Sequence, residues 1–363
     1  MKAEHIFKND ADRALPFWDG SDDNALVCIG VREETHDVKT FIFGPKRPAL
    51  FHFQPGQFIT FDFVIGDAVV NRCYTIASSP SRPHTVSITV KRVPGGPVSN
   101  WLHDNMSPGQ EVNATGALGS FSYTRHPAKK YLLLSGGSGI TPMMSMARAQ
   151  YDLAGESDIV FMHHARTPAD IIFRRELELM EVHSANFKFI PVCEADAKFH
   201  SWGGLRGRIS AGMLSVAVAD YADREVFVCG PPPYMRAVKA LLEQLGFNMA
   251  QYHEESFDFA ALEQEAAPMA PVPAGGDSFE VTFAKSQRII ACPAQSTVLD
   301  ASRAEGMRLA SSCAKGLCGT CKSKLLSGKV EMSHQGGIRQ REIDQGMILL
   351  CCSKPLSDLV IER

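Results

Sequence analysis

Three closely spaced cysteines near the C-terminus, followed by a fourth, have the pattern of metal ligands. Cys313, Cys318 and Cys321 form a C-x4-C-x2-C run, and Cys351 follows farther along the chain. Four thiolates at this spacing hold a [2Fe–2S] cluster, with three of them on one tight loop. A tetrahedral zinc site, which usually takes paired short spacings, fits this arrangement poorly. The spacing therefore predicts an iron–sulfur cluster bound by these four cysteines.

The fourth ligand requires a choice, because Cys351 and Cys352 are adjacent. Side chains alternate along a strand, so only one of the two thiols can face the loop. The stretch resembles the end of plant-type ferredoxins, where the ligand lies four residues before a proline, and Pro355 then selects Cys351. Within the loop, Gly316 and Gly319 permit unusual backbone angles and let amide groups approach the sulfurs. We expect Cys352 to be a packed thiol.

The rest of the chain has the composition of a globular protein with two or three domains. It has 363 residues, of which 45% are hydrophobic, and 37 basic against 40 acidic residues give a net charge of -3. So balanced a charge indicates neither nucleic acid nor an anionic membrane as a partner. The apolar runs are too short to span a bilayer, and residues 1–20 lack the apolar centre of a signal peptide. We therefore expect a cytoplasmic protein.

Two domains precede the cysteine-rich region. Residues 24–127 contain short alternating strands separated by Pro and Gly, which predicts a small antiparallel β-barrel or sandwich. Residues 128–259 contain short apolar strands that alternate with helical stretches, which is the rhythm of a parallel α/β sheet. Residues 1–23 have no clear periodicity, and we interpret them as an N-terminal extension.

A linker and a third domain complete the chain. Residues 260–276 are rich in Ala, Pro and Gly and are interpreted as a semi-stiff linker. Residues 277–363 hold the cluster cysteines and carry 12 Lys and Arg residues against 9 Asp and Glu residues, a net charge of +3. Lys315, Lys322 and Lys324 lie in or just after the cluster loop. They are either solvated surface lysines or a docking surface for an acidic partner.

A seven-residue motif in the first domain resembles a known flavin-binding element. Residues 72–78 match the R-x-Y-[ST]-x-x-S pattern of the ferredoxin–NADP reductase superfamily. The resemblance implies that Tyr74 lies against the isoalloxazine ring, that Thr75 bonds near flavin N5, and that Arg72 pairs with the pyrophosphate. These roles suit an aromatic face, a hydroxyl and a guanidinium fork. Taken alone, R-x-Y-T is also an ordinary edge-strand sequence.

Two further segments resemble flavin-binding elements of the same superfamily. Residues 95–102 form a Gly-rich turn that opens a helix and can receive phosphate at its N-terminus. Residues 116–121 resemble the turn beside the flavin, with Ala117 in place of the usual proline. Each segment alone is an ordinary turn, but their order favours a flavin domain, and the Ser99 turn with residues 116–121 favours FAD over FMN. The resemblance assigns further flavin contacts to Ser78, Val90, Lys91, Gly96, Val98 and Ser99.

The α/β domain carries two motifs that resemble nicotinamide-binding elements. Residues 134–142 pass from a strand through a Gly-rich turn into a helix, where backbone amides can bind a pyrophosphate. Residues 229–231 resemble the C-G-P motif near the nicotinamide ring, although a lone cysteine there is by default a small buried strand residue. The residues assigned by this resemblance are Gly136, Gly137, Gly139, Thr141, Pro142, Cys229, Gly230 and Pro231.

The end of the α/β domain resembles the E-x-F element that approaches the flavin in such reductases. Glu255 and Phe257 occupy its two defined positions, although Glu255 could equally be a solvated charge at a helix end. The catalytic candidates that follow from these resemblances are Tyr74, Thr75, Cys229 and Glu255.

Two histidines and an arginine follow the second strand of the α/β domain. His163 and His164 face opposite sides of a strand, so they cannot chelate one metal, and we interpret them as rim residues near the adenosine. Arg166 and Asp170 resemble the family's stretch on that side of the nicotinamide site. One arginine does not establish a preference for a 2′-phosphate, and the resemblance favours NADH over NADPH.

The order of the three domains resembles that of iron–sulfur flavoprotein reductases, and this resemblance implies a plant-type ferredoxin domain of β-grasp fold for residues 277–363. Within them, the chain is most similar to reductases of two-component Rieske monooxygenases that act on quaternary amines such as glycine betaine or stachydrine. This resemblance implies electron transfer from NADH through FAD and [2Fe–2S] to an oxygenase. A reductase of a hybrid-cluster protein and a non-enzymatic redox carrier or sensor are the alternatives.

Overall fold

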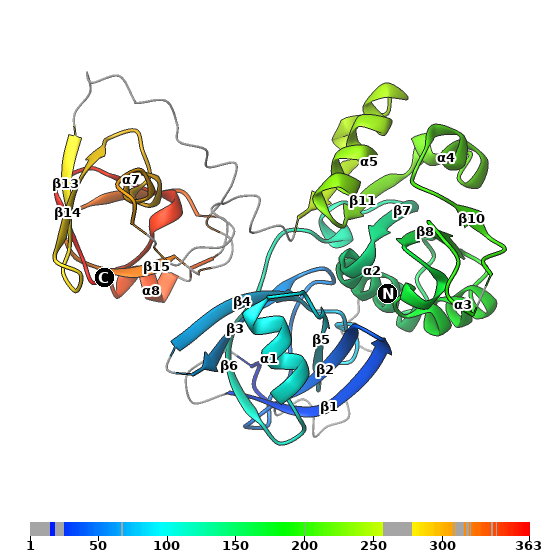
Figure 1. The fold of residues 1–363 in the computed structure, drawn as a ribbon, viewed down its shortest axis with the longest axis horizontal. Coiled ribbons are helices and arrows are strands. Elements are labelled where there is room, and N and C mark those ends of the chain that lie inside the picture. Colours follow the sequence, from blue (N-terminus) through cyan, green and yellow to red (C-terminus); the bar gives the residue numbers. More distant parts are fainter. Residues whose placement is uncertain are drawn as a thin grey trace. The chain divides into compact units, whose positions relative to one another are not determined.

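The computed structural model describes two compact units, Met1–Phe257 and Asp258–Arg363 (Figure 1). The described residues are 15–18, 25–66, 68–199, 201–256, 278–307, 309, 316, 319, 321–334, 337–338 and 340–363. The interpreted linker at 260–276 lies outside these residues. None of the described helices is long and apolar enough to cross a membrane.

The first unit begins with an antiparallel sheet of six strands, as the alternating sequence predicted. The strand order is β4-β3-β6-β1-β2-β5, and a bridge between Ile76 and Ile88 brings the two edges of the sheet together as in a barrel. Phenylalanines on alternate positions, such as Phe41, Phe43 and Phe61, fill the interior. The strands are β1 (Leu26–Thr35), β2 (Val38–Pro45), β3 (Phe58–Ile65), β4 (Ala68–Thr75), β5 (Val86–Lys91) and β6 (Glu111–Leu118), and helix α1 spans Pro97–Asn105.

A short part of the N-terminal extension packs against this barrel. Phe17 bridges Leu50, and the buried ring of Trp18 lies 5.4 Å from that of Phe51, centroid to centroid. The interpretation of residues 1–23 as an extension concerns mainly residues outside the described part.

The second sheet is parallel throughout and has the order β10-β9-β8-β7-β11-β12, as the alternating rhythm predicted. Helices α2 and α3 pack on one face, and α4 and α5 pack on the other. The strands are buried on both faces, which explains their continuous apolar runs. The strands are β7 (Lys130–Gly136), β8 (Asp158–Ala165), β9 (Phe187–Cys193), β10 (Leu205–Arg206), β11 (Glu225–Cys229) and β12 (Tyr252–Glu255); the helices are α2 (Ile140–Asp152), α3 (Arg174–His183), α4 (Ala211–Ala217) and α5 (Pro232–Gln244).

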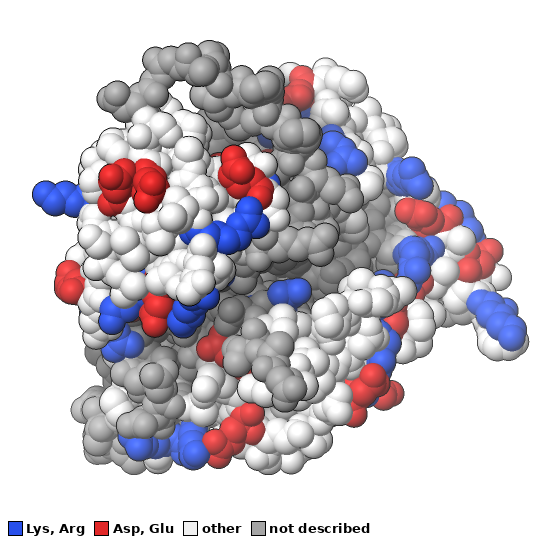
Figure 2. Space-filling view, turned by 60° about the vertical axis from the view of Figure 1, so that its left-hand side comes forward, with Lys and Arg blue, Asp and Glu red and all other residues white. Residues whose placement is uncertain are grey.

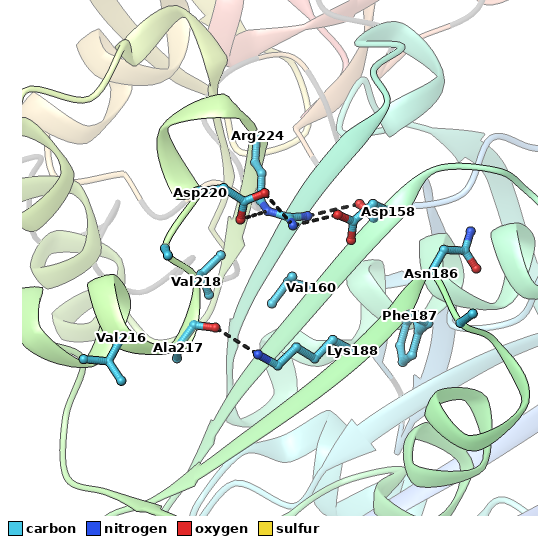
Figure 3. A pocket seen from close by; sticks show the side chains of 12 residues that line it. Asp158, Val160, Asn186, Phe187, Lys188, Val216, Ala217, Val218, Asp220 and Arg224 are labelled. Carbon is cyan, nitrogen blue, oxygen red and sulfur yellow. Dashed lines mark hydrogen bonds and ion pairs between the residues drawn. The ribbon is translucent and has the colours of Figure 1, made fainter.

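Arg224 ties together the amino ends of this sheet's strands (Figure 3). Its guanidinium is 5% exposed and bonds to the carboxylates of Asp158, at 2.8 Å, and Asp220, at 2.9 Å. It also donates to the backbone carbonyl of Tyr131. Asp158, Asp220 and Arg224 line a hollow in the surface, and the other cation that lines it, Lys188, donates to the carbonyl of Ala217. Because both cations are satisfied within the protein, we interpret the hollow as structural.

The second unit is a mixed sheet with the order β14-β13-β19-β15-β17, as expected for a β-grasp domain. Strands β13 and β19 are parallel, the other pairs are antiparallel, and α7 packs on β14. Val281, Phe283 and Leu299 are among its fully buried core residues. The elements are β13 (Ser278–Phe283), β14 (Arg288–Pro293), α7 (Val298–Ala304), β15 (Lys322–Ser327), β16 (Val330–Met332), α8 (Gln340–Asp344), β17 (Met347–Leu349), β18 (Ser353–Pro355) and β19 (Leu359–Ile361).

Replacing Arg224 by Met should destabilise the parallel-sheet domain by about 1–3 kcal/mol, because the buried carbonyl of Tyr131 loses its donor and the carboxylates of Asp158 and Asp220 lose their ion pair. Calorimetry of the intact holoprotein measures this as a lower unfolding temperature. Arg208→Met is the control, since Arg208 is 87% exposed and lies 3.8 Å from Glu194. An equal effect of both substitutions would contradict the structural role of Arg224.

Candidate functional site

The predicted flavin motif occupies the end of β4. Tyr74 packs edge-on against Phe61 and Phe63, each with ring centroids 6.2 Å away. Burial raises the pKa of Tyr74 far above its usual value, so the phenol stays neutral. Thr75 is 5% exposed, and its hydroxyl has no hydrogen-bond partner among the described residues. A buried hydroxyl in this state fits a bound group that supplies the missing partner. Arg72 lies two residues before Tyr74 on the same face of the strand, so aromatic and cationic groups lie together.

The Gly-rich turn before α1 forms the second predicted flavin element. Gly96 is the N-cap residue and is followed by Pro97 and the buried Val98. The hydroxyl of Ser99 accepts from the amide of Val93 at 3.1 Å and donates to the carbonyl of Gly96. A Cβ on Gly96 would lie 2.8 Å from that hydroxyl. Since Ser99 stabilises the turn, the groups that remain to bind phosphate are the first backbone amides of α1.

Three other residues expected to contact flavin have partners within the protein. The hydroxyl of Ser78 accepts from the amide of Ser87 at 3.0 Å. The carbonyl of Val90 accepts from the ring of His103 at 2.8 Å, and the ammonium of Lys91 lies 3.2 Å from the carboxylate of Asp37. Their contact with flavin stays a prediction.

The predicted pyrophosphate turn lies between β7 and α2 and packs against the end of β11. A Cβ on Gly139 would overlap the carbonyl of Cys229. A Cβ on Gly230 would lie 2.7 Å from the ring of Tyr234, and one on Gly136 would lie 3.2 Å from the same ring. Glycine is therefore required where these two turns meet. The other residues assigned to this element are Gly137, which has a φ of +52°, Thr141 and Pro142 in the first turn of α2, and Pro231, the N-cap of α5.

Cys229 and Glu255 are paired in register at the carboxyl ends of β11 and β12. Burial raises the pKa of the Cys229 thiol, and the neighbouring Glu255 adds to the effect. Burial also raises the pKa of Glu255 to about 8, and its Oε2 has no partner among the described residues. Glu255 ends a strand, so the alternative of a solvated helix-end charge is wrong. The pair can offer a neutral thiol and a protonated carboxyl to a nicotinamide ring.

His163 and His164 are interior residues, so their interpretation as rim residues is wrong. They are 0% and 8% exposed because β8 lies in the middle of a sheet covered on both faces. They do face opposite sides, since His163 bonds to Ser135 at 2.8 Å and His164 to the hydroxyl of Tyr234 at 3.1 Å. Burial lowers the pKa of His164 to about 4, so both rings are neutral near pH 7.

Arg166 lies in a charged group that joins two parts of the first unit. Its guanidinium is 3.4 Å from the carboxylates of both Asp37 and Asp170. Asp37 lies in the turn between β1 and β2, far from Arg166 in sequence. Asp170 also accepts from the amide and hydroxyl of Thr167. The sequence analysis identified Arg166 but did not predict its contact with the carboxylate of Asp37.

Sequence reasoning missed the residues that attach α2 to the segment after β4. The guanidinium of Arg148 is buried, forms a two-pronged pair with Glu176 at 2.7 Å, and donates to the carbonyl of Ala77 at 2.6 Å. Ser145 donates to the carbonyl of Ser78 at 2.8 Å. The only sequence signal was an arginine within an otherwise apolar predicted helix. The sequence does not show that this arginine is buried or which backbone carbonyl it reaches, because both depend on the tertiary fold.

In the second unit, Cys321 and Cys351 lie close together. The amide of Cys351 contacts the sulfur of Cys321 at 3.5 Å, and the amide of Gly316 donates to the sulfur of Cys351 at 3.2 Å. Gly316 and Gly319 have φ values of +69° and +75°, as their place in a tight loop led us to expect. Cys313, Cys318 and Phe257 lie outside the described residues. The donor chemistry of two adjacent thiols with an amide pointing at sulfur fits an iron–sulfur cluster.

The lysines near the cluster loop of the second unit were considered as a docking surface for an acidic partner. Lys322 forms an ion pair with Glu342 at 2.6 Å, which cancels its charge locally. Figure 2 shows acidic and basic side chains interspersed on the face that it draws. Lys322 is therefore not a free docking cation, and Lys315 lies outside the described residues.

Comparison with known families assigns all three domains. The sequence matches the oxidoreductase FAD-binding domain over residues 27–123, the oxidoreductase NAD-binding domain over 133–240, and the 2Fe-2S iron-sulfur cluster binding domain over 281–356. The chain is therefore an NAD(P)H-dependent flavin and iron–sulfur oxidoreductase.

Similar proteins extend over nearly the whole chain. The glycine betaine monooxygenase reductase subunit of Pseudomonas aeruginosa is 46% identical over 92% of this chain and 94% of its own. The stachydrine N-demethylase reductase subunit of Rhizobium meliloti is 41% identical over 96% and 99% of the two chains. The structure of phthalate dioxygenase reductase has a TM-score of 0.58 at 25% identity, over 95% of this chain and 100% of that one. The chain belongs to the ferredoxin–NADP reductase-type flavoproteins that carry a C-terminal 2Fe-2S ferredoxin domain.

Replacing Gly139 by Ala should weaken NADH binding by about 1–3 kcal/mol, because the added methyl displaces the turn from the Cys229 carbonyl. The KM for NADH with ferricyanide as acceptor measures the effect, with FAD content unchanged. Gly212→Ala is the control, since a Cβ there meets no atom within 4 Å. An unchanged KM in Gly139→Ala would contradict the assignment of this turn to NADH binding.

Replacing Glu255 by Gln should make the protein relatively more stable as the pH rises. The raised pKa means that the folded state holds this proton more tightly than the unfolded chain does. The stability contributed by Glu255 is therefore complete below its ordinary pKa of 4.5 and is lost as the pH rises to about 8. Thermal unfolding at pH 5, 7 and 9 measures the difference in the free energy of unfolding between the variant and wild type. This difference should change in favour of the variant by a few kcal/mol between pH 5 and pH 9. Glu254→Gln, on the exposed neighbour, is the control; equal pH profiles for the two variants would rule out the buried carboxyl.

Proposed function

We propose that this chain is the NADH-dependent reductase component of a two-component Rieske-type monooxygenase that acts on a quaternary amine. Two observations support this proposal. The chain contains three cofactor domains, and over nearly its whole length it is similar to reductase subunits named for glycine betaine and stachydrine systems. An oxygenase component would be the electron acceptor and would bind the substrate. The alternative is an NADH oxidoreductase with another redox partner as its electron acceptor. It has weaker support, because the NADH oxidoreductase HCR of Escherichia coli is only 30% identical over 91% of the chain.

The proposed flavin site uses Tyr74, Thr75 and Arg72 at the end of β4 with the turn before α1. A bound flavin accepts two electrons as a hydride and can release them one at a time, which a [2Fe–2S] cluster requires. Tyr74 would cover one face of the ring and Thr75 would donate its unpaired hydroxyl to it. Arg72 and the first amides of α1 would neutralise phosphate charge.

The proposed nicotinamide site lies at the carboxyl ends of β7, β11 and β12. The amides of the Gly136–Gly139 turn would bind the pyrophosphate, and Cys229 and Glu255 would adjoin the nicotinamide. Glu255, protonated near pH 7, can hold or donate a proton there while the buried Cys229 helps to exclude water.

The proposed preference for NADH rests on the surroundings of Arg166. Both Asp37 and Asp170 lie 3.4 Å from its guanidinium, so its positive charge is already balanced. A 2′-phosphate would bring more negative charge beside two carboxylates. A ribose with a free 2′-hydroxyl would not meet this repulsion.

Electron transfer to the partner would use the cluster of the C-terminal domain. Cys313, Cys318, Cys321 and Cys351 are the proposed ligands. Plant-type clusters have potentials near −400 mV, below the range of about −150 to +300 mV for Rieske centres, so transfer in this direction is favourable.

Replacing Cys313 by Ser should leave NADH-dependent reduction of ferricyanide within about twofold of wild type and lower coupled turnover with the oxygenase at least about a hundredfold, because the cluster is the exit for electrons. Stopped-flow flavin bleaching and product formation with the purified oxygenase measure the two activities.

Cys352→Ser is the matched control, because we assign no cluster bond to this neighbour of Cys351. It should retain both activities. Full coupled turnover in Cys313→Ser would refute the proposed order of electron transfer, and loss of flavin bleaching would place the fault before the cluster.

A further inference from the structure

Three side chains that commonly bind metals meet at the amino-terminal edge of the parallel sheet. His126 lies in the segment that enters β7, Glu225 begins β11, and His253 is the second residue of β12. All three are partly buried, and their ligand atoms lie within 4.8 Å of one another. This edge is opposite the carboxyl ends of the strands, where the nicotinamide site is proposed.

The three side chains are already arranged around one point. The Nε2 of His253 lies 2.6 Å from the Oε2 of Glu225. The rings of His126 and His253 stack with centroids 3.7 Å apart and an interplanar angle of 28°. Phe227 forms an apolar wall, with its centroid 4.8 Å from that of His253 and 6.0 Å from that of His126.

The ring of His126 has free coordinating capacity. Its nitrogens make no hydrogen bond within the described part of the chain, although its backbone amide bonds to Tyr123. The nitrogens of an imidazole ring are ordinary metal donors, so a ring without a protein partner can bind an ion. Glu225 supplies the negative charge that a divalent cation needs.

We propose that His126, Glu225 and His253 form a binding site for a divalent transition metal, with Zn²⁺ as the best match. Two imidazoles and one carboxylate are a known zinc donor set that leaves a fourth position for water. Imidazole donors disfavour Mg²⁺ and Ca²⁺, which take oxygen ligands. Small rotations of the stacked rings would open the 2.6 Å contact to admit the ion.

The site would connect the segment that joins the two domains of the first unit to the strands that carry Cys229 and Glu255. Phe227 pairs with His253, and Cys229 pairs with Glu255 two residues farther along the same strands. A metal would therefore fix the opposite ends of β11 and β12 from those that hold Cys229 and Glu255. This role is separate from the proposed reductase function and does not depend on the identity of its electron acceptor.

A second group of similar composition provides a control. His36, Asp37 and Asp170 also lie within 4.8 Å of one another, but His36 is exposed. The carboxylates of that group already contact Lys91, Arg166 and Thr167. We therefore expect this group to bind no metal.

The experiment is calorimetric titration of the oxidised, cluster-loaded holoenzyme with Zn²⁺, with the absorption spectrum showing that the cluster stays intact. We expect wild type to bind one Zn²⁺ per chain. The affinity for Zn²⁺ should fall at least about tenfold in His126→Phe and in His253→Phe. These substitutions keep an aromatic ring in the stack but remove the donor. Glu225→Gln, which is nearly isosteric, should also weaken binding, and His36→Phe should not.

Co²⁺ titration followed by electron paramagnetic resonance gives a second test, because the oxidised flavin and cluster give no signal and protein-bound Co²⁺ differs from aqueous Co²⁺ in its spectrum. The proposal expects a spectrum of protein-bound Co²⁺ in wild type and in His36→Phe, and only the spectrum of aqueous Co²⁺ in Glu225→Gln and in His253→Phe. No binding of either metal by wild type, binding unchanged in all three ligand variants, or equal loss in His36→Phe would overturn it.

Discussion

The hydrogen bonds from α2 to the backbone just after β4 are the interaction on which the first unit depends. Arg148 and Ser145 reach the carbonyls of Ala77 and Ser78, a few residues beyond Tyr74 and Thr75. The same helix begins at the Gly-rich turn of the nicotinamide domain. One rigid helix therefore sets the position of the proposed pyrophosphate turn relative to the proposed flavin residues. Hydride transfer depends on such positioning, because reacting atoms must approach closely.

The arrangement of the parallel sheet separates structural from chemical residues. At the amino ends of the strands, Arg224 satisfies its charge entirely within the protein. Toward the carboxyl ends of β8 and β12, His163, His164 and Glu255 each keep a buried polar atom without a described partner. Native proteins rarely leave such atoms unpaired, so their concentration in one region indicates where cofactors bind. The cofactor domains identified by comparison agree with this location.

Much of this organisation could be predicted from the sequence, because strand alternation, Gly-rich turns and cysteine spacing are local patterns. The antiparallel strands of the first domain and the parallel sheet of the second follow from such patterns, and Cys229 and Glu255 were assigned separately by family resemblance. That the two are paired across β11 and β12 is seen only in the structure. The errors came from tertiary packing. His163 and His164 are polar but lie in a strand covered on both faces, which their residue types do not reveal. The contact of Arg166 with Asp37 joins residues distant in sequence, and no local pattern indicates it.

The central claim is that electrons from NADH pass through a flavin to a [2Fe–2S] cluster within this one chain. Anaerobic titration of the holoprotein with NADH, followed by absorption and by electron paramagnetic resonance, tests it most directly. The account predicts bleaching of the flavin together with the signal of a reduced [2Fe–2S] cluster. Flavin bleaching without that signal would contradict it and would leave a plain flavin reductase whose cluster is absent or outside the path of the electrons.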